Sequence, residues 1–271
     1  MNGTEFSLPG INLFNLYQYL VIFFVASLRI ASFLISAPFF SFGSIPLQIR
    51  IVASISLTAF LFPVIKIPDI QQMQALNLFI LVLSEIGIGL AAGLILTILF
   101  SAASVAGEKI ASTAGLSMSS MIDPQSGGQT LVLSSVLFLF LISCFLSLDG
   151  HLYLIKILIE SYVFLPIGFS LNFSQVSNIA IHTFGNMLYL AALISLPIVG
   201  GLLLIQCSIG IITRSAPSLN LFSFGFPIAL ISVFIFLYAG VGSISHAFSD
   251  LTGAAINILD TVLHSSIKKG L

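Results

Sequence analysis

Long, uninterrupted apolar runs dominate the pattern of the chain. They cover approximately residues 13–37, 49–65, 76–100, 130–148, 180–212 and 221–246. A helix needs about 20 apolar residues to cross the hydrocarbon core of a bilayer, and several runs reach that length. Because the runs are continuous rather than alternating, and because a helix satisfies its own backbone hydrogen bonds in lipid, they predict helices rather than strands. We therefore expect an all-α, multi-helix, membrane-associated protein with six apolar helices.

The pattern changes beyond the sixth run. In residues 247–271, Leu259, Val262 and Leu263 belong to an apolar series at three- and four-residue steps, while charged residues such as Asp260 lie elsewhere. This spacing is typical of an amphipathic helix. It predicts a C-terminal helix at a surface or against a partner.

Charged residues are rare. Of the 271 residues, 58% are apolar and only 6% are charged, whereas a soluble domain carries roughly 25% charged residues. The chain therefore belongs in a bilayer or inside an equally apolar protein shell. The 8 Lys and Arg residues are scattered and the formal net charge is -1. No basic surface is available to neutralise a phosphate backbone, which excludes nucleic-acid binding.

The sequence carries no motif of a catalytic or metal site, such as HExxH, GxSxG or GxxxxGK[ST]. Cys144 and Cys207 lie in apolar runs and form no CxxC pair, which favours packing over redox chemistry. Four histidines lack a second histidine at the spacing of a helical metal site: His151, His182, His246 and His264. We expect neither enzyme activity nor a cofactor.

An unusual segment follows the third apolar run. More than half of residues 101–129 are Gly, Ala, Ser or Thr, and Met118 and Met121 lie among them. A linker this long is usually functional or disordered. Small side chains make few strong contacts and methionines adapt to irregular surfaces, so we interpret the segment as a movable plug in a pore. A plain surface loop is the alternative.

The same segment contains charged residues. Glu108 and Lys109 are adjacent, so they point to different sides of a helix and each is expected to find a partner elsewhere. Asp123 and Pro124 fit the N-cap and first position of the following helix, which we favour over proton chemistry.

Two charges lie inside apolar runs, where they are costly. Arg29 and Glu85 are separated by enough chain to meet after folding, and for Glu85 a buried ion pair is favoured over a proton relay. Gly89 and Gly93 follow Glu85 at four-residue steps, which lets another helix approach this face closely. Further along, Arg214 suits the end of a helix and Pro217 the turn that follows it.

An ordered set of motifs over about residues 20–230 resembles the FliR family of flagellar biosynthetic proteins. The set comprises Arg29, Pro38, Phe39, Pro46 and Arg50, then Glu85 to Gly93, GEKIASTAGLSMSSMIDPQSG, DGHL, LPIG, RSAPSLNLF and GFP. The superfamily includes the T protein of virulence type III secretion, but SMIDPQSG and GFP are more similar to the flagellar branch. Thr113 and Ser218 stand where relatives often have glutamine.

The resemblance implies a non-enzymatic, channel-forming subunit of the type III export gate in the bacterial inner membrane. Such a subunit assembles with FliP and FliQ, works alongside FlhA and FlhB, and passes unfolded flagellar subunits. It also implies a FliP-like part at 1–179 and a FliQ-like hairpin with a C-terminal helix at 180–271.

Two groups of residues carry these expectations. The plug is assigned to residues 107–127, with Gly107, Glu108, Lys109, Gly115, Met118, Met121, Asp123, Pro124 and Gly127. The second group is expected to supply buried charges or to contribute to assembly, and it comprises Arg29, Arg50, Glu85, Gly89, Gly93, Arg214 and Pro217.

Other functions stay open. One is the virulence paralogue, and another is a secondary transporter with Glu85, Glu108 and Asp123 as proton sites. A transporter moves a small solute when purified alone. A gate subunit with so little polar surface is instead expected to aggregate without its partners.

Overall fold

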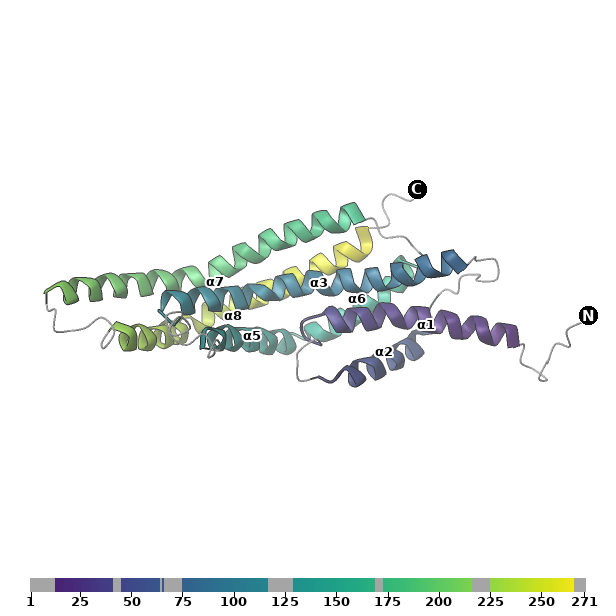
Figure 1. Cartoon of the computed structure of the whole chain (residues 1–271), viewed down its shortest axis with the longest axis horizontal. Helices are drawn as coiled ribbons and strands as arrows, with labels where there is room; N and C mark the ends of the chain where they lie inside the picture. The colour runs from purple at the N-terminus through teal and green to yellow at the C-terminus, as the bar shows by residue number, and fades with distance from the viewer. Residues whose placement is uncertain are drawn as a thin grey trace, which may run out of the picture. The chain divides into compact units, whose positions relative to one another are not determined.

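The structure is a computed structural model of the chain, and it describes residues 13–40, 45–63, 65, 75–116, 129–168, 173–215 and 225–265. All regular elements in these ranges are helices (Figure 1): α1 Leu13–Ser36, α2 Leu47–Leu61, α3 Ala75–Thr113, α5 Gln129–Ser147, α6 Gly150–Phe164, α7 Phe173–Ser215 and α8 Phe226–Ser265. The predicted all-α membrane protein is thereby confirmed.

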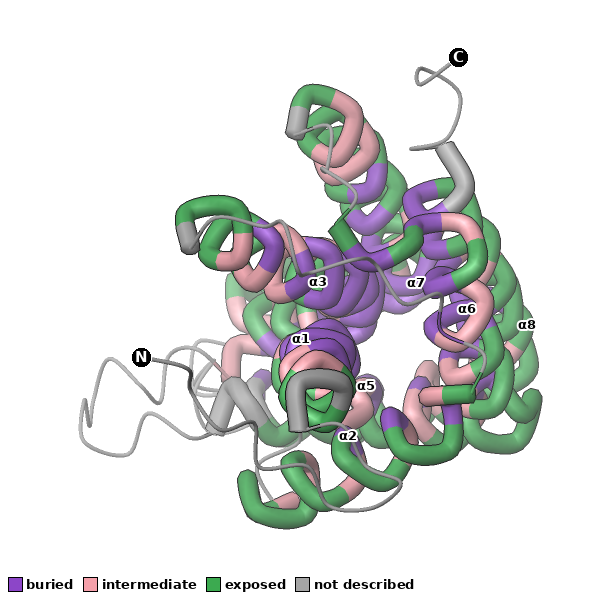
Figure 2. The backbone as a smooth tube through the Cα atoms, turned by 90° about the vertical axis from the view of Figure 1, so that its right-hand side faces the viewer, coloured by how far each residue is buried: buried purple, intermediate pink, exposed green. Residues whose placement is uncertain are grey.

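The chain folds into two compact units. Unit 1 comprises Met1–Thr97, Leu152–Ala180 and Asn257–Leu271, and unit 2 comprises Ile98–His151 and Ile181–Ile256. In unit 1, α1 and α2 lie side by side (Figure 1). In unit 2, aromatic pairs join the helices: Phe100 of α3 meets Phe145 of α5 edge-on at 5.2 Å, and Phe140 lies 5.5 Å from Phe248 of α8. Buried residues line α1 and α3 (Figure 2).

Six apolar runs were predicted, but fewer helices are long enough to cross a bilayer. Among the described residues, four helices are long and apolar enough to cross a bilayer, namely α1, α3, α7 and α8. A fifth span results if the bent pair α5 and α6 counts as one. The second predicted span is the 15-residue helix α2, which is shorter than the roughly 20 residues that a bilayer requires.

Helix α3 runs farther than predicted. The small-residue segment was expected to begin a linker at residue 101, but the helix continues to Thr113. Alanine has the highest helix propensity, and buried alanines share one face of the extension. That face carries Ala102, Ala103, Ala106 and Ile110. Small side chains therefore continue the packing of α3 instead of ending it.

Helix α6 was not predicted, because Lys156 and Glu160 interrupt its apolar pattern. These side chains are four residues apart and approach to 3.9 Å on its outer face. A bend of 69° separates α5 from α6. At this bend, Asp149 has a φ of 55° and Gly150 contacts the ring of Phe145, where a Cβ would lie 2.3 Å from the ring.

The last predicted apolar run and the amphipathic tail are one helix, α8. They were expected to be separate, but nothing in the sequence between them stops a helix. The predicted apolar face is present, since Leu259, Val262 and Leu263 are buried and Asp260 is exposed.

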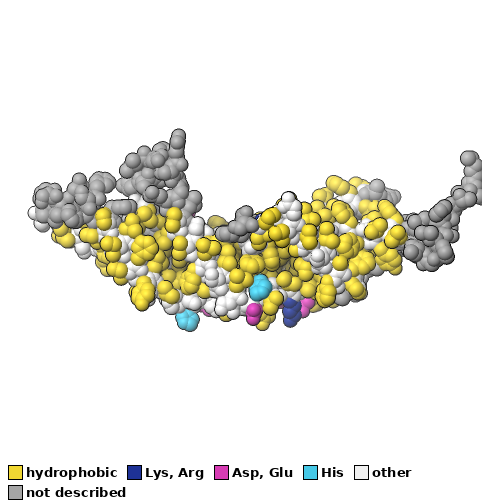
Figure 3. Space-filling model, turned by 90° about the horizontal axis from the view of Figure 1, so that it is seen from below, with side chains coloured by type: hydrophobic (Ala, Val, Ile, Leu, Met, Phe, Trp, Pro, Cys, Tyr) yellow, Lys and Arg dark blue, Asp and Glu magenta, His cyan; other side chains and the backbone are white. Residues whose placement is uncertain are grey.

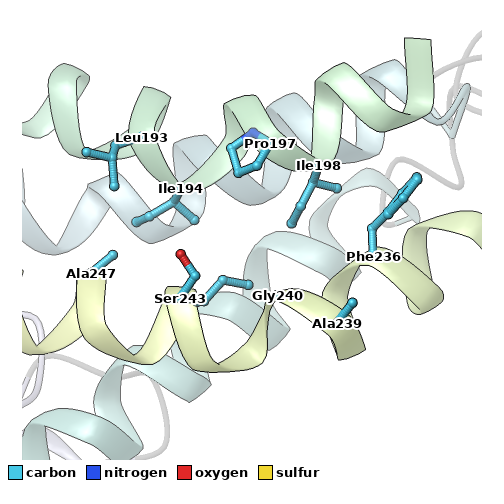
Figure 4. A pocket seen from close by; sticks show the side chains of 10 residues that line it. Leu193, Ile194, Pro197, Ile198, Phe236, Ala239, Gly240, Ser243 and Ala247 are labelled. Atoms are coloured by element: carbon cyan, nitrogen blue, oxygen red, sulfur yellow. The ribbon is translucent and has the colours of Figure 1, made fainter. Parts of the chain in front are cut away.

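Helices α7 and α8 pack closely in unit 2. Gly201 lets the ring of Phe236 approach the α7 backbone, where a Cβ would meet it at 2.6 Å. Pro197 lies inside α7. Together with Ser243 and Ala247 of α8 it lines an open cavity of about 250 Å³ (Figure 4).

Candidate functional site

Arg29 of α1 and Glu85 of α3 form a buried ion pair in unit 1. Both side chains are fully buried. Nε of Arg29 donates to Oε2 of Glu85 at 2.7 Å, and Nη2 donates to Oε1 at 3.0 Å. Two parallel bonds of this kind are the strongest geometry available to arginine and a carboxylate. The pairing considered from the sequence is therefore present.

The same guanidinium group also holds the end of α6. Nη2 of Arg29 donates to the carbonyl of Leu165 at 2.9 Å, and Nη1 donates to the carbonyl and the hydroxyl oxygen of Ser161 at 3.1 Å and 3.2 Å. The last carbonyls of a helix have no partner within it, and a cation suits this end of the helix dipole. Arg29 thus joins α1, α3 and α6 at one point.

Tyr162 completes this cluster. The guanidinium carbon of Arg29 lies 4.4 Å from the centre of the Tyr162 ring, and the phenolic hydroxyl donates to the carbonyl of Ala26 at 2.7 Å. The described contacts use all five N–H groups of arginine. A buried pair satisfied in this way is costly to break. Both carboxylate oxygens of Glu85 accept bonds from Arg29, which suits a structural charge rather than a proton carrier.

The predicted close approach on the glycine face of α3 is confirmed, and the neighbour is α1. A Cβ on Gly89 would lie 2.3 Å from the carbonyl oxygen of Arg29. One on Gly93 would lie 1.9 Å from Oγ of Ser36 and 2.9 Å from the Ala37 nitrogen. These distances are below any real Cβ contact, so only glycine permits the packing that brings Arg29 to Glu85.

A second group of predicted residues lies where α3 ends, in unit 2. Gly107 is buried against α5, and a Cβ there would meet the Ser134 backbone at 2.6 Å. Gly115 has a φ of 85° and ends the helix in the left-handed conformation that favours glycine. Glu108 and Lys109 are exposed on the last turns of α3. The beginning of the predicted plug is therefore the end of a helix.

The remaining predicted residues are dispersed or not described. Arg50 lies in the first turn of α2, donates from Nη2 to the carbonyl of Ile45 at 3.0 Å and lines an apolar cavity of about 490 Å³. Arg214 was grouped with the buried charges but is exposed in the last turn of α7, where a cation faces the helix dipole. Six residues fall outside the described ranges: Met118, Met121, Asp123, Pro124, Gly127 and Pro217.

Sequence reasoning missed the α6 side of the charge cluster. Ser161 and Tyr162 were not selected, although they directly follow Glu160, and three adjacent polar side chains are a usable signal. Leu165 takes part through its backbone carbonyl, and the type of side chain at a position does not reveal such a contact. Within the described ranges, no group of three His, Cys, Asp or Glu residues is placed to hold a metal ion.

The outer surface is apolar. Hydrophobic side chains cover most of the face drawn in Figure 3, with few charged groups among them. Exposed large side chains occur along the long helices, including Tyr238 at 86% and Leu204 at 72% exposure. Such a surface requires lipid or other protein against it.

Comparison with known proteins gives a consistent result. The sequence pattern described as bacterial export proteins, family 1, matches residues 20–255. The chain is 29% identical to the flagellar biosynthetic protein FliR of Escherichia coli (strain K12), over 89% of this chain and 94% of that protein. It is 30% identical to FliR of Pectobacterium carotovorum subsp. carotovorum, over 81% and 84% of the two chains.

A relative from another system has similar identity. The Yop proteins translocation protein T of Yersinia pestis is 30% identical, over 76% of this chain and 79% of that protein. These matches confirm the resemblance read from the motifs. The chain therefore belongs to family 1 of the bacterial export proteins, which includes FliR and this T protein, and is an integral membrane component of a type III export apparatus.

Proposed function

We propose that the chain is a channel-forming subunit of the flagellar type III export gate in the bacterial inner membrane. It assembles with FliP and FliQ, works alongside FlhA and FlhB, and passes unfolded flagellar subunits. In this proposal residues 1–179 are the FliP-like part and residues 180–271 the FliQ-like hairpin and C-terminal helix. Several FliR relatives match more of this chain, 80% to 89%, than the T protein does at 76%, which supports the flagellar branch.

The main support for this proposal is the length of the apolar helices. Helix α7 has 43 residues and α8 has 40, which at about 1.5 Å per residue gives roughly 60 to 65 Å each. The hydrocarbon core of a bilayer is only about 30 Å thick. Tilting shortens the projected length too little to remove the difference. Apolar side chains such as Tyr238 and Leu204 are exposed along these helices. Lipid can cover only part of helices this long, which supports an assembly with protein partners.

We further propose that residues 107–127 close the channel as a plug. The packing of Gly107 against Ser134 brings the end of α3 close to the beginning of α5. The two ends of the segment are thereby held by packed helices, while its own small side chains offer little that resists displacement. A reversible closure requires ends that are held in place and, between them, side chains that make few strong contacts.

The structure argues against Glu85 as a proton site in the alternative function, a secondary transporter. Glu85 is fully buried and bound at both oxygens by Arg29. A carboxylate that takes up and releases protons needs a path to solvent and a less costly neutral state. A gate uses the same pair to hold three helices together.

Production of the chain with and without its partners tests the assembly. With FliP and FliQ present, the chain should be recovered in a stable complex from solubilised membranes. Without them it should aggregate or be degraded, because its apolar helices stay uncovered. A soluble, homogeneous chain in detergent without either partner would contradict the proposal.

A further inference from the structure

A cavity of about 490 Å³ lies between α1, α2 and α6, and all of its lining residues belong to unit 1. Its wall is apolar, with Phe33 from α1, Leu57 from α2 and Leu158 from α6 among its residues. Only Arg50 and Ser56 add polar groups to the lining. The volume is in the range of roughly 300–1,000 Å³ that is typical of ligand sites. The cavity therefore combines an apolar wall with one cation.

The position of that cation is unusual. Arg50 is the one charged residue of α2 and lies in the first turn of this helix, where the helix dipole disfavours a positive charge. Its Nη2 donates to the carbonyl of Ile45 at 3.0 Å, which is an uncharged acceptor. Arginine has five N–H donors in a planar group that matches a phosphate. An anionic ligand in the cavity would explain why a cation is placed here.

The length of α2 indicates the depth of Arg50 in the membrane. The helix has 15 residues, or about 22 Å, and cannot cross a hydrocarbon core of about 30 Å. Apolar side chains such as Val52 and Phe60 are exposed along it, which suits contact with lipid. A charged group is far less costly at the depth of the headgroups than in the hydrocarbon. Arg50 therefore places the beginning of α2 at the headgroups.

The cavity follows α2 from this depth toward the hydrocarbon. Its lining on α2 begins at Ile49 and Arg50 and continues through Ala53 to Leu57, which lies two turns or about 10 Å beyond Arg50. Ile155 of α6 adds to the apolar wall. A ligand that fits carries negative charge at one end and hydrocarbon at the other. A phospholipid with an anionic headgroup has this chemistry.

From this arrangement we infer that the cavity is a binding site for an anionic phospholipid of the surrounding membrane. Arg50 binds the headgroup phosphate, and an acyl chain lies between α1, α2 and α6. Basic pockets between the helices of membrane proteins bind anionic headgroups in the same way. The inference is independent of the proposed channel and plug, because it requires only the packing within unit 1.

Lipid binding to the complex purified from membranes tests the inference. The complex is titrated in detergent with phosphatidylglycerol, which is anionic, or with phosphatidylcholine, which is zwitterionic, and native mass spectrometry counts the bound lipid. The parent should bind phosphatidylglycerol more tightly. Arg50→Gln should weaken the binding of phosphatidylglycerol roughly 5-fold, as expected for the loss of one cation beside the lipid. An unchanged affinity for phosphatidylglycerol would overturn the inference.

Lys156→Gln is the matched control. Lys156 is an exposed cation of the same unit, with 68% of its side chain accessible, and it does not line the cavity. Its removal should leave the affinity for phosphatidylglycerol unchanged. An equal loss in Arg50→Gln and Lys156→Gln would mean that lipid responds to the overall charge of the surface, which would overturn a site at Arg50.

A second substitution tests the apolar part of the site. Ala53→Phe fills the cavity from α2, so it should exclude the acyl chain and lower the binding of both lipids. Undiminished binding of phosphatidylglycerol would overturn the inference. It would also be overturned if the parent complex bound no phosphatidylglycerol and Ala53→Phe released a partner subunit, because the cavity would then hold a protein side chain.

A measurement on the parent complex covers a failure of these variants to assemble. Phosphatidylglycerol with a photoreactive diazirine in its acyl chain is added to the complex and activated by light. The label should be found on residues 49–57 of α2 or on residues 155–158 of α6, which line the cavity. Label found only on other helices would overturn the inference.

Discussion

Arg29 and Glu85 meet through two hydrogen bonds, of 2.7 Å and 3.0 Å, with both side chains fully buried. They are 56 residues apart in the sequence. Because Arg29 also binds carbonyls at the end of α6, this one pair fixes the relative positions of three helices. The packing of unit 1 therefore depends on a charge that water does not reach.

Removing one partner of this pair should be severely destabilising. Glu85→Ala leaves the Arg29 charge buried and unpaired, which costs about 3–5 kcal/mol. Thermal unfolding of the purified complex measures the loss. The double substitution Arg29→Met with Glu85→Met should be less damaging than the sum of the single ones, because it leaves no uncompensated charge. Strictly additive effects would show that the pair is not coupled.

Arg29→Lys tests the contacts with α6. Lysine keeps the positive charge but cannot form two parallel bonds to Glu85 while also reaching the carbonyls of Ser161 and Leu165. We expect a lower unfolding temperature and less assembled gate than in the parent. Stability equal to that of the parent would mean that charge alone is sufficient.

Gly89→Ala should separate α1 from α3. A Cβ there lies 2.3 Å from the backbone oxygen of Arg29, so the helices must move apart at a cost of about 1–3 kcal/mol. Gly185→Ala on α7 is the control, since nothing lies within 4 Å of a Cβ at that position. The control should be neutral or stabilising. Equal loss of stability in both variants would contradict close packing at Gly89.

Gly107→Ala should loosen the base of the plug. The new methyl group meets backbone atoms of Ser134 at 2.6 Å and 2.9 Å, and backbone cannot rotate away as a side chain does. We expect a gate that assembles but leaks ions more than the parent. Gly210→Ala on α7, where no atom lies within 4 Å, should not leak. Tight membranes with Gly107→Ala would argue against this packing as an anchor.

Much of unit 1 follows from the sequence. The helices α1 and α3 are long apolar runs, and a buried arginine and glutamate in two such runs already favour each other as partners. The spacing of Gly89 and Gly93 indicates the face that α1 occupies. The contacts with Leu165 and Ser161 could not be predicted in full, because backbone carbonyls have no sequence signature.

The small-residue segment shows where sequence patterns become ambiguous. Ala, Ser and Gly are common in loops, but alanine is also the best helix former, so residues 101–113 are compatible with either state. In the structure these residues are helical, because the burial of Ala102, Ala103 and Ala106 favours the helix. The bond from Gln206 to Thr113 links positions 93 residues apart, and only the fold brings them together.

The mass and composition of the solubilised particle test the central claim most directly. Membranes that contain the whole export apparatus should yield this 28.9 kDa chain in a hetero-oligomer several times its own mass, together with FliP and FliQ. A monodisperse 28.9 kDa monomer that moves a small solute into vesicles without any partner would contradict the account.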